Sequence, residues 1–226
     1  MDYGIFYRPH SVLSGDFYWL GFKDDKTFLA VADCTGKGIS ASLLSVMGIS
    51  LLNYIVLSKN YETLGDYLKE LDKKWLETFQ SENEDKMFNN DWMEIALLKI
   101  DRNNFMLEFS GARLSVIIRR TDGKLVEMRS NRYPIGGWQI EKNREYHTEK
   151  IFLEKGYEIY LFSDGITDQF GGDKDKKFGR KNLRKLIQME FKGSMKEKVD
   201  YIKEMLEIWM GKHYQTDDIT LIGLRV

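Results

Sequence analysis

The chain has 226 residues, of which 42% are hydrophobic and 31% are charged, and its formal net charge is −1. That length and apolar content are enough for one large domain with a substantial core. The balanced charge lacks the basic excess of nucleic-acid-binding proteins, so we expect no nucleic-acid partner. The single cysteine, Cys34, excludes an internal disulfide, which fits a cytoplasmic location.

No transmembrane or targeting segment is predicted. The apolar runs at 95–98 and 114–118 are too short to cross a bilayer. Residues 1–4 lack the basic and apolar regions of a signal peptide and lead almost directly into a predicted strand. We therefore expect no membrane contact by this domain and a longer parent protein, which could itself be membrane-anchored.

The first part of the chain is predicted to contain two strands and then two helices. Residues 16–22 and 27–33 are rich in aromatic and β-branched side chains, and the polar residues between them predict a hairpin turn. Apolar residues at helical spacing predict helices over 39–57 and 61–79. The polar segment 81–91 is predicted to be a loop.

Strands dominate the next part of the chain, and helices come near its end. The predicted strands are 92–101, 104–110, 113–120, 124–130, 146–153 and 157–163. Helices are predicted at 179–191 and 195–211, and a strand at 218–226 closes the chain. Because strands and helices come in blocks rather than in strict alternation, the predicted fold class is α+β with mainly antiparallel sheets.

Aspartates stand at the ends of several predicted strands. Asp33 and Asp164 each follow an apolar strand. Asp16 begins a strand, and Asp217 with Asp218 opens the last one. Buried carboxylates are costly unless they are paired or bind a metal, and such oxygen donors suit Mg²⁺ or Mn²⁺. The pattern is also typical of turns and helix caps, so the residues alone leave both interpretations open.

Four short motifs occur in order along the chain. They are Ser14-Gly15-Asp16-Phe17-Tyr18-Trp19, Ala32-Asp33-Cys34-Thr35-Gly36-Lys37-Gly38, Phe162-Ser163-Asp164-Gly165-Ile166-Thr167-Asp168 and Asp217-Asp218-Ile219-Thr220-Leu221. In order and spacing they resemble the SpoIIE-like branch of the PPM (protein phosphatase type two C) family of metal-dependent serine/threonine phosphatases. The resemblance covers nearly the whole chain. It implies a four-layer α-β-β-α sandwich and a single PPM-type phosphatase domain over 1–226, the C-terminal catalytic part of a longer signalling protein.

The resemblance also implies a site for two divalent cations, Mn²⁺ or Mg²⁺. Asp33 would bridge both ions, and the backbone carbonyl of Cys34 would be a further ligand. Asp164 and Asp217 would hold the second ion, and Asp16 would hold the first directly or through water. Water activated by the ions would attack phosphorus, so Asp33 and Asp164 are predicted to be catalytic through that metal-bound water.

Several neighbouring residues are predicted to have other roles. Asp218 stays an alternative to Asp217 as a ligand, and Asp218 and Asp168 are predicted to support the ligands. Arg8 is a candidate contact for the substrate phosphate. Ala112 stands where many members of the wider family carry a metal-binding aspartate, so a third metal is not expected there.

The implied function is hydrolysis of phosphoserine or phosphothreonine on a bacterial signalling partner, for example a phosphorylated anti-sigma-factor antagonist. A regulatory domain or protein is expected to act on the helices that follow Asp33. The alternative is a catalytically silent PPM-fold interaction module in a partner-switching pathway. The presence of all the expected aspartates favours the enzyme. A hydrolase of small phosphate esters would use the same site.

Overall fold

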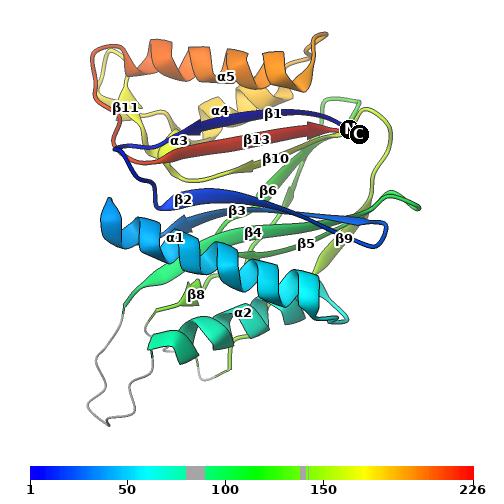
Figure 1. Cartoon of the computed structure of the whole chain (residues 1–226). Coiled ribbons are helices and arrows are strands. Elements are labelled where there is room, and N and C mark those ends of the chain that lie inside the picture. The colour runs from blue at the N-terminus through cyan, green and yellow to red at the C-terminus, as the bar shows by residue number, and fades with distance from the viewer. Residues whose placement is uncertain (80–89, 138–140, 142) are drawn as a thin grey trace.

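Two packed β-sheets form the centre of the computed structural model, which describes residues 1–79, 90–137, 141 and 143–226 (Figure 1). Sheet A contains, in spatial order, β1 (Asp2–Arg8), β13 (Ile219–Arg225), β10 (Glu158–Phe162), β6 (Val116–Arg119) and β7 (Leu125–Met128). Sheet B contains β2 (Asp16–Lys23), β3 (Lys26–Cys34), β4 (Trp92–Asp101), β5 (Met106–Ala112) and β9 (Glu149–Phe152), with β8 (Ile135–Gly136) paired to β4. Neighbouring strands in both sheets are antiparallel.

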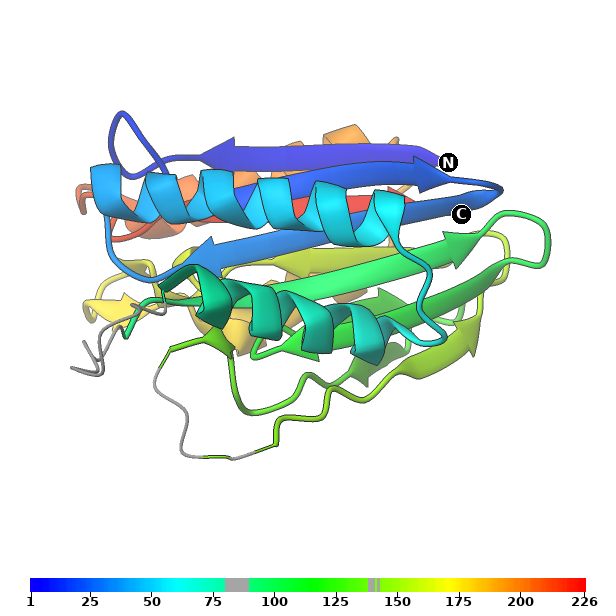
Figure 2. The ribbon, with the colours of Figure 1, turned by 60° about the horizontal axis from the view of Figure 1, so that its bottom comes forward.

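Helices cover the outer faces of both sheets. Sheet B is covered by α1 (Ile39–Leu52), the π-helix η1 (Asn53–Leu57) and α2 (Leu64–Phe79), which lie across its face in Figure 2. Sheet A is covered by α4 (Gly179–Gln188) and α5 (Met195–Met210). A single turn, α3 (Gly165–Asp168), follows β10, and a small hairpin is formed by β11 (Phe170–Gly171) and β12 (Lys176–Lys177). The predicted α+β class and the four-layer α-β-β-α sandwich are therefore confirmed.

The predicted strands and long helices are present, with ends shifted by a few residues. For example, α2 begins at Leu64 rather than at 61, because Thr63 caps it: the Asp66 amide donates to Thr63 Oγ1 at 3.2 Å, and the Thr63 amide donates to Asp66 Oδ2 at 3.0 Å. The short elements β8, α3, β11 and β12 were not predicted. Most of the loop predicted at 81–91 lies outside the described residues.

Strand alternation divides the side chains among three cores. In β3, Leu29 and Val31 point toward sheet A and pack with residues such as Ile222. The intervening Ala30 and Ala32 point toward α1 and α2. The outer face of sheet A packs separately against α4 and α5. Because Asp33 continues the alternation of Leu29 and Val31, its side chain is directed between the sheets at the end of their shared core.

The segment Ile39–Leu57 is long and apolar enough to span a membrane by length and composition. It lies on sheet B, where Leu44, Leu52, Ile55 and Val56 are buried in the outer core. A core helix with this composition passes the same test, and the packing accounts for its buried side. The sequence predicts one continuous helix here, whereas the last five residues form the π-helix η1.

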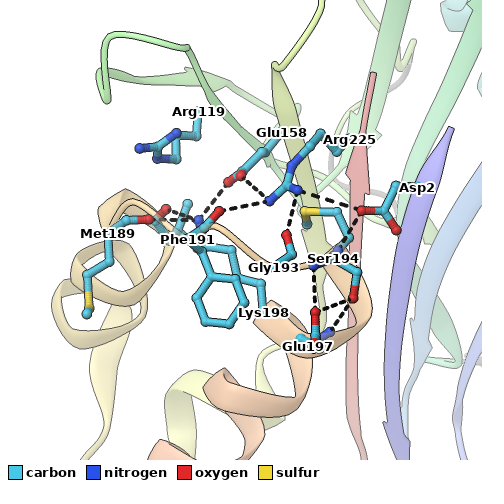
Figure 3. Close-up of polar contacts among 12 residues, drawn as sticks. Asp2, Arg119, Glu158, Met189, Phe191, Gly193, Ser194, Glu197, Lys198 and Arg225 are labelled. Atoms are coloured by element: carbon cyan, nitrogen blue, oxygen red, sulfur yellow. Dashed lines mark hydrogen bonds and ion pairs between the residues drawn. The ribbon is translucent and has the colours of Figure 1, made fainter.

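The end of sheet A farthest from Asp33 is held by a buried ionic network (Figure 3). Lys198 of α5 is 1% exposed, and its ammonium lies 2.7 Å from Glu158 at the start of β10. It also donates to the backbone carbonyls of Ile187 and Met189, both at 2.9 Å. Arg225 contacts the other Glu158 oxygen at 3.0 Å. The network fastens the α4–α5 connection to the sheet, so that the charges buried there are paired.

Candidate metal centre

Strand register places three carboxylates in one row across sheet B. Asp16 of β2 is paired with Asp33 of β3, and Asp33 is paired with Glu94 of β4. Side chains of paired residues in an antiparallel sheet share a face. All three therefore point toward sheet A at the end of the sandwich where β3 leads into α1. Glu94 was not predicted from the sequence, because no motif marks it and only the β3–β4 register brings it beside Asp33.

Two hydroxyl groups near the strand ends of sheet A donate hydrogen bonds to Asp16. Asp16 Oδ2 accepts hydrogen bonds from Ser163 Oγ at 2.5 Å and from Thr220 Oγ1 at 2.7 Å. Both hydroxyl residues are fully buried, and Asp16 is 1% exposed. The other oxygen, Oδ1, is buried and has no hydrogen-bond partner among the described residues. A buried, unpaired carboxylate oxygen is costly unless a ligand meets it, and a hard cation fits that position.

Two further aspartates approach from sheet A because the chain is closely packed there. Asp164 precedes α3, and Asp217 precedes β13. At Gly165 an added Cβ would lie 1.9 Å from the carbonyl oxygen of Asp218, so only glycine lets the two segments touch. Asp164 and Asp217 are in this way held close enough to Asp33 for their charges to raise its pKa. Figure 1 shows α3, which follows Asp164, at the same end of the sandwich as the start of α1.

Lysines partner two of the exposed carboxylates around the site. Lys37 Nζ lies 3.1 Å from Asp217 Oδ2 and also donates to the Thr216 carbonyl at 2.6 Å. Lys177 of β12 lies 2.5 Å from Asp168 Oδ2. Asp168 is therefore paired with a lysine on the neighbouring hairpin, while its amide donates to the Asp164 carbonyl at 2.8 Å.

The carboxylates raise one another's pKa. Burial raises the pKa of Asp16 to about 7, against the opposing hydrogen bonds of Ser163 and Thr220. Burial, and then the negative charges of Asp16, Asp164, Glu94 and Asp217, raises the pKa of Asp33 well above its usual range. Without a counter-charge, these groups favour their protonated forms. Positive charge placed among them would restore the carboxylates, which is the electrostatic signature of a cation site.

Cys34 is the last residue of β3, next to the connection that leads into α1. Its side chain is 2% exposed, and burial raises the pKa of its thiol, so the sulfur is not a reactive nucleophile. The backbone turns sharply just beyond it, where Gly36 and Gly38 have φ angles of 90° and 68°. This turn starts α1 five residues after Cys34 and leaves Lys37 beside Asp217.

The geometry distinguishes the two neighbouring aspartates at the start of β13. Asp218 is 6% exposed, and its two oxygens accept backbone hydrogen bonds from His10 at 2.6 Å and Gly15 at 2.8 Å. It thereby anchors the loop that leads into Asp16. Asp217 is more exposed, and its Oδ2 faces Lys37. This favours Asp217 as a ligand and Asp218 as a support.

Arg8 is directed away from the carboxylates. Its guanidinium lies against α5, 3.1 Å from Glu207 Oε1 and 3.1 Å from Met210 Sδ. These contacts do not place Arg8 at the carboxylates, and its contact with the substrate phosphate stays a prediction.

The site is assembled only in part. Across the described ranges of the chain, no three His, Cys, Asp or Glu side chains lie close enough together to form a ready-made metal site. Two of the carboxylates are instead paired with cationic side chains, Asp217 with Lys37 and Glu94 with Arg113. The oxygen donors, their burial and the orphaned Asp16 Oδ1 nevertheless fit a hard divalent cation.

Comparisons with known proteins agree with this architecture. Residues 23–226 match the family described as stage II sporulation protein E (SpoIIE). The phosphoserine phosphatase RsbU of Bacillus subtilis (strain 168) is 27% identical over 225 residues, which cover 100% of this chain but 63% of RsbU. The chain thus spans less than two thirds of that relative.

Solved structures share the fold. The SiaA-PP2C domain of Pseudomonas aeruginosa superposes with a TM-score of 0.86 at 25% identity, covering 99% of this chain and 85% of that one. The SpoIIE PP2C phosphatase domain of Bacillus subtilis, solved with a fragment of its regulatory domain, gives 0.79 at 19% identity, covering 100% and 63%. With its family match extending over residues 23–226 and its sandwich shared with these domains, the chain belongs to the SpoIIE family.

Proposed function

We propose that this chain is a metal-dependent protein serine/threonine phosphatase. One observation carries the proposal: the Asp16–Asp33–Glu94 row of sheet B faces Asp164 and Asp217 of sheet A at the end of the inter-sheet core. Membership of a family that includes phosphatases supports the same reaction. The buried thiol of Cys34 offers no competing covalent mechanism.

The proposed ligands are those expected from the family resemblance. Asp33 would bridge two Mn²⁺ or Mg²⁺ ions, Asp16 and the Cys34 carbonyl would complete the first, and Asp164 and Asp217 the second. When bound, the ions would activate water and offset the charge of the phosphoryl oxygens.

The chain's own groups would prepare this site. Ser163 and Thr220 fix Asp16 so that its unpaired Oδ1 faces the ligand position. Asp218 holds the backbone just before Asp16. Lys37 would compete with a cation for Asp217 Oδ2, because Asp217 Oδ1 already accepts the Asp218 amide at 2.9 Å.

We further propose a phosphorylated signalling protein as substrate, with an anti-sigma-factor antagonist as the specific candidate. The relative RsbU acts on phosphoserine, as its name states. We also propose that the chain is the catalytic part of a longer cytoplasmic or membrane-anchored protein. The 63% coverage of RsbU supports this.

Regulation would act through α1, the helix that follows Asp33. Its solvent side is apolar, with Ile39 71%, Leu43 66% and Val46 62% exposed. Its buried side is tied to the metal site, because Ser45 Oγ donates to the Gly15 carbonyl at 2.7 Å, one residue before Asp16. A regulatory domain or protein that binds the apolar side of α1 could therefore shift the position of Asp16.

The proposed function is tested by hydrolysis of p-nitrophenyl phosphate and of a phosphoserine peptide with Mn²⁺ present. Activity should disappear with EDTA and in Asp33→Asn. Activity that survives both would exclude the metal mechanism. A well-folded protein that is inactive with Mn²⁺, Mg²⁺ and every phosphopeptide tried would favour the silent interaction module. Activity confined to p-nitrophenyl phosphate would favour a hydrolase of small phosphate esters.

A further inference from the structure

We propose that Arg113 contacts the phosphoryl group of the substrate. The inference rests on the proposed phosphatase function and adds that this side chain binds the phosphoryl group. A cation in this role must lie at the rim of the carboxylate row, be accessible to substrate and keep hydrogen-bond donors available. Arg113 meets each of these requirements.

Arg113 lies beside the carboxylate row. Its Nε is 2.7 Å from Glu94 Oε1, and Glu94 is the cross-strand neighbour of Asp33. The Glu94 side chain is 17% exposed and that of Arg113 is 45% exposed. The guanidinium thus sits at the open side of the row, where a phosphoryl group approaching Asp33 would pass.

The backbone around Arg113 is held in an uncommon conformation. Its φ is 66°, in the left-handed region that residues other than glycine seldom adopt. The Arg113 amide donates to the Asn131 carbonyl at 2.9 Å, and the Asn131 amide donates to the Gly111 carbonyl at 2.8 Å. Such conformations persist where surrounding structure enforces them, often at functional sites. Here the conformation turns the side chain back from the end of β5 toward Glu94.

The guanidinium is oriented on two sides and open on the third. Its carbon lies 5.8 Å from the centroid of the Trp92 ring, and its Nε is taken by Glu94. Neither terminal nitrogen of Arg113 is hydrogen-bonded to a residue that the structure describes. A planar pair of N–H donors held in this way is suited to bidentate binding of a phosphate.

The other cations near the site fit the role less well. Arg8 contacts Glu207 and Met210 on α5. Lys37 and Lys177 are paired with Asp217 and Asp168, and a lysine ammonium cannot bind two phosphate oxygens in a planar fork.

The competing explanation is that Arg113 only neutralises Glu94. Three variants distinguish phosphate binding from mere neutralisation of Glu94: Arg113→Lys, Arg113→Met, and Arg113→Met combined with Glu94→Gln. The matched control is Arg132→Lys, at an exposed arginine. For each, we would measure KM and kcat on a phosphoserine peptide, and the Kd of inorganic phosphate and of Mn²⁺ by calorimetry. Circular dichroism and thermal unfolding confirm folding.

If Arg113 grips phosphate, Arg113→Lys and Arg113→Met raise KM and the phosphate Kd about 10-fold or more, and Mn²⁺ affinity stays within about twofold. The double variant stays impaired, and Arg132→Lys matches wild type. Recovery of phosphate binding in the double variant would overturn the inference, as would an Arg113→Lys that behaves like Arg132→Lys.

The phosphate measurement keeps the two proposals apart. An inactive wild-type protein that binds phosphate through Arg113 would contradict the phosphatase function and support this inference. If the wild-type protein is active but binds phosphate equally well in the Arg113 variants, the phosphatase function is supported and this inference is contradicted.

Discussion

The hydroxyl of Thr220 lies 2.7 Å from the carboxylate of Asp16, although the two residues belong to different sheets. Ser163 makes the same contact, and its Oγ also accepts the Thr220 amide at 3.0 Å. The two hydroxyl groups therefore act as one unit that fixes Asp16 relative to sheet A. Because Asp164 and Asp217 lie on that sheet's strand ends, this unit sets the spacing of the candidate ligands.

Thr220→Val should weaken Mn²⁺ binding about 10-fold or more, because it keeps the shape of the side chain but removes the hydrogen bond that orients Asp16. Thr220→Ser keeps the hydroxyl and serves as the matched control. Calorimetric titration with Mn²⁺ measures both. Equal affinity in Thr220→Val and wild type would show that the hydroxyl has no part in orienting the ligand.

The metal-free protein should lose stability as the pH rises from about 4 to about 7. In the folded protein the pKa of Asp16 is raised from 3.8 to about 7, so the folded state holds a proton that the unfolded state releases over this window. Since the folded state binds more protons, the free energy of unfolding falls with pH, by at most about 1.4 kcal/mol per unit for one such group.

Asp16→Asn removes this ionisable group and should flatten that dependence. We expect the variant, in EDTA, to be more stable than wild type at pH 8 and to bind Mn²⁺ poorly. Urea denaturation at pH 5 and pH 8 provides the measurement. Identical pH slopes for the two proteins would mean that another group dominates, and added Mn²⁺ should stabilise wild type alone.

Ser45→Ala should lower Mn²⁺ affinity while leaving the fold intact, because Ser45 links α1 to the Gly15 carbonyl beside Asp16. The control is Ser50→Ala, at an exposed serine on the same helix whose hydroxyl donates to the Val46 carbonyl at 2.9 Å. If both variants bind Mn²⁺ like wild type, α1 does not influence the site through this hydrogen bond, and the proposed regulatory route loses its support.

Lys198→Met should destabilise the protein by about 3 kcal/mol or more, because it leaves Glu158 buried without its ammonium partner (Figure 3). Lys196→Met is the matched control: Lys196 is on the same helix but exposed, and its pair with Asp200 should contribute less than about 1 kcal/mol. Mn²⁺ affinity should be unchanged in both, since Glu158 lies at the opposite end of β10 from Asp164. A loss of Mn²⁺ binding in folded Lys198→Met would contradict that separation.

Local sequence determined much of this architecture. The aromatic and β-branched side chains and the apolar run over 27–33 predict a strand that ends at Asp33, and β3 runs over Lys26–Cys34. Helical spacing predicts α5 to within a residue, since a capping box at Ser194 and Glu197 fixes its start. These features depend on neighbours in the chain, so a sequence pattern records them.

Short and non-local features were decided by the tertiary structure. The turn α3 and the hairpin β11–β12 are too short to have a periodic pattern, and Gly171 has room for no Cβ beside the Trp209 carbonyl. Likewise, an apolar run at helical spacing cannot tell an α-helix from the π-helix η1, because both bury residues at similar intervals.

For the candidate site, the sequence by itself determined which carboxylates end strands: Asp16, Asp33, Asp164 and Asp217. Only the tertiary structure brought Glu94 beside Asp33, turned Arg8 toward α5 and set Thr220 against Asp16. The physical reason is that strand register and sheet packing bring together residues far apart in the chain, and a linear pattern does not record that contact.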